Sequence, residues 1–194
     1  MKPNYERYRL RKGLILGFHG CEEEVAKQVA AEGIHLKNSE NDYDWLGNGI
    51  YFWENNPDRA LEWASKNHKI KKPAVIGAVL DLGFCLDLTE SVACDEVSLV
   101  FSTLKLRETL GETELPANRG KSQDLILRHL DCTVIKTLHS IREGSGLPSY
   151  ASVRAAFHEG GLLYEGAGFS RRAHIQICVR ERACILGYFK PMAD

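Results

Sequence analysis

The chain has 194 residues, of which 44% are hydrophobic and 26% charged, and its formal net charge is −1. This length and composition predict one globular domain with enough chain to bury a core. The near-neutral charge gives no overall bias toward nucleic acid or an anionic membrane. The sequence has two local basic clusters. The first is Lys2, Arg7, Arg9, Arg11 and Lys12, and the second is Lys66, Lys69, Lys71 and Lys72. Solvated surface would also explain both clusters.

The cysteines favour a reducing compartment. The chain holds Cys21, Cys85, Cys94, Cys132, Cys178 and Cys184, with no CxxC pair and largely apolar neighbours. Buried free thiols explain this pattern better than a disulfide framework or a zinc site. There is no secretory signal and no apolar run of membrane-spanning length, so we expect a cytoplasmic protein without membrane contact.

The first half of the chain predicts strands that alternate with short helices. We expect a basic arm over residues 1–12, strands near 13–18, 49–53, 75–82 and 84–88, and a polar loop over 37–48. One helix should begin at Glu22 and end before Gly33, with acidic residues at its N-terminus. Asn56 followed by Pro57 is a strong start for a second helix that ends near His68.

The second half predicts a helical region and then more strands. Residues 89–145 form a helical layer or insertion, with one helix that carries Leu99, Leu104, Leu106 and Leu110 and another that carries Leu125, Ile126, Leu130, Val134, Ile135 and Leu138. A loop over 111–124 separates them, and strands follow over 152–157, 174–179 and 185–189. The fold class that this order predicts is α+β.

Two stretches carry the candidate chemistry. The first, Gly17 to Cys21, places His19 at the end of an apolar strand; the second, Leu46 to Phe52, is a glycine-flanked turn that enters an aromatic strand at Tyr51. Glycine lets a backbone bend or approach a ligand closely, so the two stretches suit a flat, ring-containing polar ligand. Alternatively, His19 is a core histidine bound to a backbone carbonyl, and Tyr51 is a packing residue.

Gln176 is the third candidate. Along residues 174–179 the side chains alternate, with His174, Gln176 and Cys178 on one face and apolar residues on the other. A polar amide in such a strand either reaches solvent, on a strand exposed on one side, or finds buried partners. No Walker loop, GxSxG elbow, HExxH helix or GxGxxG after a strand is present, and the histidines lack metal-ligand spacing, so we expect no metal.

These motifs together resemble the ADP-ribosyltransferase fold, on the side of the diphtheria toxin and the poly(ADP-ribose) polymerases. Phe18-His19-Gly20 is similar to the family's histidine–glycine motif, and Gly47-Asn48-Gly49-Ile50-Tyr51-Phe52 is similar to its G-x-G-I-Y-F strand. The segment from His174 to Phe189 resembles the last catalytic strand and the strand after it. The likeness covers residues 14–83 and 150–190 and is closest to a bacterial subgroup of mono-ADP-ribosyltransferase-like proteins.

The resemblance implies a split β-sheet core flanked by helices, with NAD as co-substrate. His19 would bind the adenosine-side ribose, the Gly20 backbone would bind the carboxamide, and Tyr51 would stack on the nicotinamide ring. The NAD-binding set would be His19, Gly20, Cys21, Asn48, Gly49, Tyr51 and Phe52, and the catalytic set His19, Tyr51 and Gln176. Cys21 stands where the family has a serine or threonine, and the family's helix serine has no match near Arg59.

The main departure is at the third catalytic position, where Gln176 (or, on a one-residue shift, Ile175) stands in place of the family's glutamate. An amide can hold a ribose hydroxyl but cannot take a proton at neutral pH. The resemblance therefore implies mono-transfer to a macromolecular acceptor, with nucleic acid slightly favoured over protein, and with Glu159, Glu165 or His174 as candidate base. A toxin or defence role with a paired antitoxin would fit. An NAD glycohydrolase and a non-catalytic module that binds NAD or ADP-ribose are the alternatives.

Overall fold

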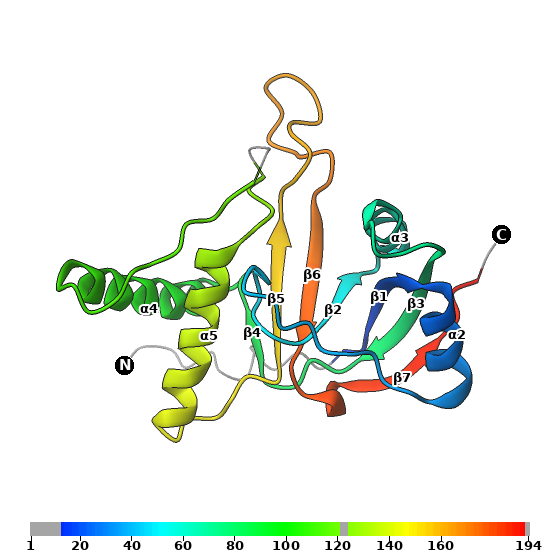
Figure 1. Ribbon diagram of the computed structural model, residues 1–194, viewed down its shortest axis with the longest axis horizontal. Helices are drawn as coiled ribbons and strands as arrows, with labels where there is room; N and C mark the ends of the chain where they lie inside the picture. Colours follow the sequence, from blue (N-terminus) through cyan, green and yellow to red (C-terminus); the bar gives the residue numbers. More distant parts are fainter. Residues whose placement is uncertain (1–12, 121–123, 193–194) are drawn as a thin grey trace.

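The protein is a mixed α+β structure built on one sheet (Figure 1), as expected. The computed structural model describes residues 13–120 and 124–192; the predicted basic arm lies outside the described residues. Seven strands follow the order β4-β5-β6-β2-β1-β3-β7, with β4 and β5 parallel and every other neighbouring pair antiparallel. The strands are β1 (Ile15–Glu22), β2 (Ile50–Glu54), β3 (Pro73–Leu80), β4 (Cys85–Asp87), β5 (Ser152–Phe157), β6 (His174–Val179) and β7 (Ile185–Phe189).

The two short helices begin and end where local chemistry predicts. Helix α2 (Glu23–Glu32) has two glutamates in its first turn and ends at Gly33, whose φ of 65° is the left-handed conformation that glycine adopts readily. Helix α3 (Pro57–Lys66) begins with the Asn56 side chain accepting the Arg59 backbone N–H at 3.0 Å. It ends two residues before the predicted His68.

The long middle helices differ from the sequence prediction in what they bury. Helix α4 (Ser91–Thr109) buries Val100 and Leu104, whereas Leu99 and Leu106 are exposed. Helix α5 begins at His129 and ends at Gly144, so Leu125 and Ile126 precede it, and Leu125 has a φ of 46° that is incompatible with a helix. The prediction that these two residues belong to the helix was wrong, because apolar spacing alone does not report backbone conformation.

Apolar side chains pack on both faces of the sheet. One face carries a large cluster that includes Phe52, Ile177 and Val179 together with Val29 of α2. The other face carries two separate clusters: Leu46, Val153 and Cys178 pack with α4 and α5, whereas Phe18 and Trp53 pack with Ala60 of α3. Helices α5 and α3 accordingly stand on either side of β6 and β2 (Figure 1).

The sheet is weakly joined at its centre. Strand β1 pairs with β3 over eight residue pairs, from Ile15 opposite Leu80 to Glu22 opposite Pro73. It pairs with β2 over only two, Gly17 opposite Glu54 and Phe18 opposite Trp53. The ladder between β1 and β2 stops before His19, so the strands separate at the two stretches singled out in the sequence.

A buried arginine holds the other half of the sheet together. Arg154 of β5 donates to both oxygens of Glu54 at 2.6 and 3.0 Å and to Asp87 at 3.3 Å, which links β5 to β2 and β4. The two carboxylates raise the pKa of Arg154 further. Buried ions need such partners, because an uncompensated charge in the interior costs several kcal/mol. Within the described residues, no helix is both long enough and apolar enough to cross a membrane.

The buried His139 makes the stability of the protein depend on pH. His139 of α5 is 5% exposed, and neither ring nitrogen has a hydrogen-bond partner among the described residues. Burial, assisted by Arg180 and Arg142, lowers its pKa to about 4. As pH falls below the ordinary value near 6.5, the unfolded chain takes up the proton first, so the free energy of unfolding decreases between about pH 6.5 and 4, by up to roughly 3 kcal/mol.

We expect His139→Phe to remove this part of the pH dependence, since phenylalanine keeps a planar ring and has no titratable proton. Urea unfolding at pH 7.5, 5.5 and 4.5 measures it, with His35→Phe on the surface as the matched control. An unchanged slope against pH in His139→Phe would contradict the assignment.

Candidate functional site

A cavity of about 730 Å³ lies where β1 and β2 separate. Its walls come from β1, β2, β6, the 37–49 loop and one face of α3 with the turn that follows. Residues 126 and 127 and two side chains of the β5–β6 connection complete it. The volume is in the range of small-molecule sites. His19, Gly49, Tyr51 and Gln176, from three segments distant in sequence, all line it.

His19 bridges the opening between the strands. Its Nδ1 lies 2.7 Å from the carbonyl oxygen of Tyr51. A carbonyl only accepts, so Nδ1 carries the proton and Nε2 keeps a lone pair. Burial lowers the pKa of His19, which keeps the ring neutral at physiological pH. The residue thus combines both interpretations drawn from sequence: it is satisfied by a backbone carbonyl, and it lines the cavity.

Tyr51 is fixed at its far end by the glycine turn. Its hydroxyl donates to the Gly47 carbonyl at 2.7 Å and accepts the Leu46 N–H at 3.0 Å. Gly47 has a φ of 80°, which explains the need for glycine at this turn. Burial raises the pKa of the Tyr51 hydroxyl, so this group stays protonated and acts as an anchor. The ring is what Tyr51 can present to the cavity.

Gln176 is buried, at 5% exposure, so the alternative of a strand exposed on one side was wrong. Its Oε1 accepts a hydrogen bond of 2.7 Å from Nε1 of Trp45. Trp45 stacks on Phe157 with ring centroids 3.8 Å apart, and Arg128 lies over its ring at 5.4 Å. The Trp45 bond fixes the orientation of the amide and leaves the NH₂ group of Gln176, a donor, for the cavity.

A second indole contributes an unused donor. Trp53 of β2 lines the cavity and is 4% exposed, and its Nε1 has no hydrogen-bond partner among residues 13–120 and 124–192. A buried N–H without a partner is costly, roughly 1–3 kcal/mol. The polar groups that a ligand in the cavity can meet are Nε2 of His19 and the amide of Gln176, whereas Nε1 of Trp53 is enclosed by the protein.

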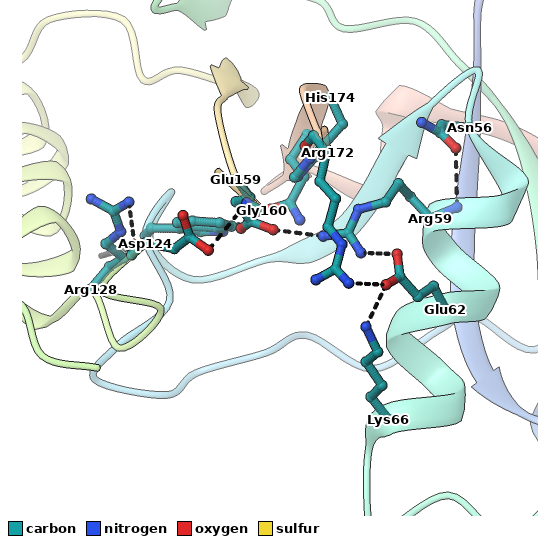
Figure 2. Close-up of polar contacts among 12 residues, drawn as sticks. Asn56, Arg59, Glu62, Lys66, Asp124, Arg128, Glu159, Gly160, Arg172 and His174 are labelled. Atoms are coloured by element: carbon teal, nitrogen blue, oxygen red, sulfur yellow. Dashed lines mark hydrogen bonds and ion pairs between the residues drawn. The ribbon is translucent and has the colours of Figure 1, made fainter. Parts of the chain in front are cut away.

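Charged side chains cross the mouth of the cavity (Figure 2). Arg59 of α3 donates to Glu159 and to Glu62, each at 2.6 Å. Glu62 also pairs with Lys66 and, at 3.0 Å, with Arg172 of the β5–β6 connection. Hydrogen bonds from Lys66 and Arg59 lower the pKa of Glu62 to about 2, so it remains ionised.

The three candidate bases are placed differently. Glu159 is 8% exposed and lines the cavity, held by Arg59. His174 is buried nearby but does not line the cavity; its Nδ1 donates to the Arg172 carbonyl, and burial lowers its pKa. Glu165 is exposed on the β5–β6 connection, away from the cavity wall.

Four residues predicted to bind NAD do not line the cavity. Phe52 and Cys21 point into the core on the opposite face, where burial raises the pKa of the Cys21 thiol to about 11. Asn48 is exposed on the turn. Gly20 packs on α3, where a Cβ would stand 2.2 Å from the Ala60 carbonyl oxygen, so its glycine character serves helix packing.

Sequence reasoning missed Trp45, Trp53 and Arg59 as site residues. The alternation of β2 places Trp53 on the same face as Tyr51, so that signal was present. The positions of Trp45 in a polar loop and Arg59 in a helix give no indication of the partners they meet 131 and 100 residues away.

A smaller cavity of about 450 Å³ adjoins the site. It is lined mostly by apolar side chains of α4, α5 and β5, and Trp45 belongs to the walls of both cavities. Within the described part of the chain, no three His, Cys, Asp or Glu side chains are grouped to hold a metal ion.

Comparisons with known proteins give no family for this chain. No protein-family model matches it, and no curated protein matches its sequence.

We expect Trp45→Phe to destabilise the protein by about 1–3 kcal/mol, since it removes the indole N–H and leaves the buried Gln176 oxygen without its donor. Chemical unfolding checks this, with Trp63→Phe, at a tryptophan that is 43% exposed, as the matched control. Equal stability of Trp45→Phe and the control would show that the Trp45–Gln176 bond contributes little.

Proposed function

We propose that this protein is an NAD-dependent mono-ADP-ribosyltransferase with an ADP-ribosyltransferase-like sheet. One observation carries the proposal: His19 of β1, Tyr51 of β2 and Gln176 of β6 border a single cavity at the point where β1 and β2 separate. These are the three strand positions that the family resemblance implies for the catalytic set.

The polar groups of the cavity suit the two riboses and the nicotinamide of NAD. His19 offers a fixed acceptor at Nε2 for a hydroxyl of the adenosine-side ribose, and Gln176 offers a donor for the nicotinamide-side ribose. The ring of Tyr51, held by its hydroxyl, offers an aromatic face for the nicotinamide ring.

Cationic side chains suit the pyrophosphate. Five lysine or arginine side chains and two carboxylates line the cavity, the cations being Lys37, Arg59, Lys66, Lys69 and Arg172. Arginine and lysine bind phosphate oxygens through charge-assisted hydrogen bonds. The excess of cations in the cavity contrasts with the net charge of −1 of the whole chain.

The proposed reaction breaks the bond between the ribose carbon and the nicotinamide nitrogen. The bonding electrons leave with nicotinamide, which becomes neutral, and the acceptor nucleophile attacks the oxocarbenium-like carbon and gives up a proton. Of the three candidate bases, Glu159 alone lines the cavity, and we assign it the role of accepting that proton. Positioning and electrostatics supply the acceleration in such a displacement.

A second candidate is a module that binds NAD without turning it over. The observation in its favour is the hydrogen bond from Trp45 to Gln176, which occupies the amide oxygen and presents a neutral donor where a charged acceptor would stabilise the oxocarbenium ion. The presence or absence of nicotinamide release separates the two.

We expect His19→Ala and Tyr51→Phe to lower the rate of nicotinamide release to different extents. His19→Ala removes the Nε2 acceptor and should lower nicotinamide release at least 100-fold. Tyr51→Phe keeps the aromatic face and loses only the hydroxyl anchor, so it should lower release less than tenfold. Incubation with adenine-labelled NAD and cell lysate measures nicotinamide and the label on protein, RNA, DNA and free ADP-ribose.

The same assay includes the outcomes that contradict the proposal. Label found only in free ADP-ribose would indicate a glycohydrolase. NAD binding by calorimetry without nicotinamide release would indicate the binding module. Absence of both NAD binding and nicotinamide release would exclude NAD as the ligand.

The lowered pKa of His19 predicts the pH profile. Protonation at Nε2 converts the acceptor into a donor, and because the pKa lies below its ordinary value near 6.5, kcat/KM should be constant from pH 8 to 6.5 and fall only at lower pH. Steady-state rates of nicotinamide release across pH 5–8 check this. A midpoint at or above 6.5 would contradict a neutral, buried His19.

A further inference from the structure

The segment after α3 forms a basic turn at the edge of the cavity. Lys66, His68, Lys69, Lys71 and Lys72 are all exposed here, and we call residues 66–72 the basic turn. Of these five, Lys66, His68 and Lys69 also line the cavity. Two lysines of the second basic cluster, Lys66 and Lys69, therefore lie at the proposed site, and all four are exposed to solvent.

The backbone of the basic turn is fixed. Asn67 closes the end of α3 through its N–H, and its side chain accepts the Lys69 N–H at 3.0 Å. Both carboxylate oxygens of Glu22, at the end of β1, accept the backbone N–H groups of Lys71 and Lys72 at 2.7 and 2.8 Å. These bonds use main-chain atoms and restrict where the lysines stand. Lys66 pairs with Glu62 and Lys72 lies 3.9 Å from Glu23, whereas Lys69 and Lys71 have no ion pair within the described part of the chain.

An exposed aromatic ring stands beside the turn. Trp63 of α3 is 43% exposed and lines the cavity, and its ring lies 5.8 Å from that of buried Trp53. One side of the indole is thus supported by the protein. Trp63 and Lys66 are three residues apart and share a face of α3, so ring and cation point to the same region.

We propose that Trp63 and the basic turn bind single-stranded nucleic acid, which enters the cavity as the acceptor of ADP-ribose. An aromatic platform next to a track of lysines is the arrangement that binds single strands, because every base can stack on an indole and the phosphates pair with cations. A duplex keeps its bases stacked on one another and offers none to Trp63. Arg172, 44% exposed across the cavity mouth, extends the cationic track.

The binding part of this proposal is independent of NAD, and the acceptor part rests on the proposed function. The first experiment therefore uses no NAD: fluorescence anisotropy of fluorescein-labelled 20-mers of thymidine, uridine and a self-complementary duplex, from 50 to 250 mM salt. The thymidine and uridine arms distinguish DNA from RNA.

We expect the single strands to bind with a log–log salt slope of about −3, corresponding to roughly four phosphate contacts. Lys69→Gln/Lys71→Gln removes two of those contacts and should reduce the slope by about half and the affinity more than tenfold at 50 mM salt. Trp63→Ala should weaken binding about tenfold and leave the slope unchanged, because stacking is not ionic.

The matched control is Lys105→Gln/Arg107→Gln, which removes the same two charges from α4 at the opposite end of the molecule (Figure 1). It should bind like the unmodified protein. Equal losses in the control, absence of single-strand binding at 50 mM salt, or tighter binding of the duplex would each overturn the proposal.

The second experiment tests the acceptor role with labelled NAD and the same oligonucleotides. Lys71→Gln/Lys72→Gln, at two lysines of the basic turn that do not line the cavity, should keep nicotinamide release within about threefold and lose most of the label on nucleic acid. Label on protein alone would overturn the acceptor role. Absence of nicotinamide release in the unmodified protein would instead refute the proposed function, and the anisotropy result would still decide whether the surface binds nucleic acid.

Discussion

The short pairing between β1 and β2 is the constraint on which the site depends. β1 is held along its length by β3 and pressed against α3 at Gly20, whereas β2 follows β6 over four residue pairs. The two strands therefore belong to different halves of the sheet and meet only at Phe18 and Gly17. Beyond that point the imidazole of His19 replaces the missing ladder by binding the carbonyl of Tyr51, and the cavity opens beside it.

Charged residues have two distinct roles in this fold. Arg154, buried with Glu54 and Asp87, joins strands within one half of the sheet and has no access to the cavity. Arg59 joins α3 to Glu159 across the cavity mouth and lines it. Exposed ion pairs contribute little stability, whereas pairs at a partly buried mouth fix the positions of groups that a ligand meets. The ion pairs of Arg154 hold the strands of the sheet together, and the ion pairs of Arg59 fix side chains that line the cavity.

Local sequence signals predicted the elements well where chemistry is local. The Asn56–Pro57 start of α3, the Gly33 end of α2 and the alternation of β6 are properties of a few adjacent residues, and the structure confirms them. The predicted start of α5 was wrong because Leu125 adopts a left-handed backbone conformation, which the spacing of apolar residues does not report.

The composition of the cavity was harder to predict than the strands around it. Alternation along β6 placed Gln176 on one face, but only the tertiary structure shows that this face is buried and that Trp45 supplies the partner. Phe52 was expected at the ligand because it follows Tyr51, yet adjacent residues of a strand point to opposite faces, and it is fully buried in the core. Contacts between distant segments determine which polar groups remain available.

Trp45 is a partition between the 730 Å³ cavity and the apolar cavity of 450 Å³ beside it. Its ring is held by Phe157 and Arg128, and its N–H by Gln176, so its position is shared between two compartments. An apolar molecule that displaced the ring from behind would change the amide presented in front. By thermodynamic reciprocity, occupancy of the front would then change the affinity behind by the same factor. Ligand binding in the two cavities would then be coupled through the position of the Trp45 indole.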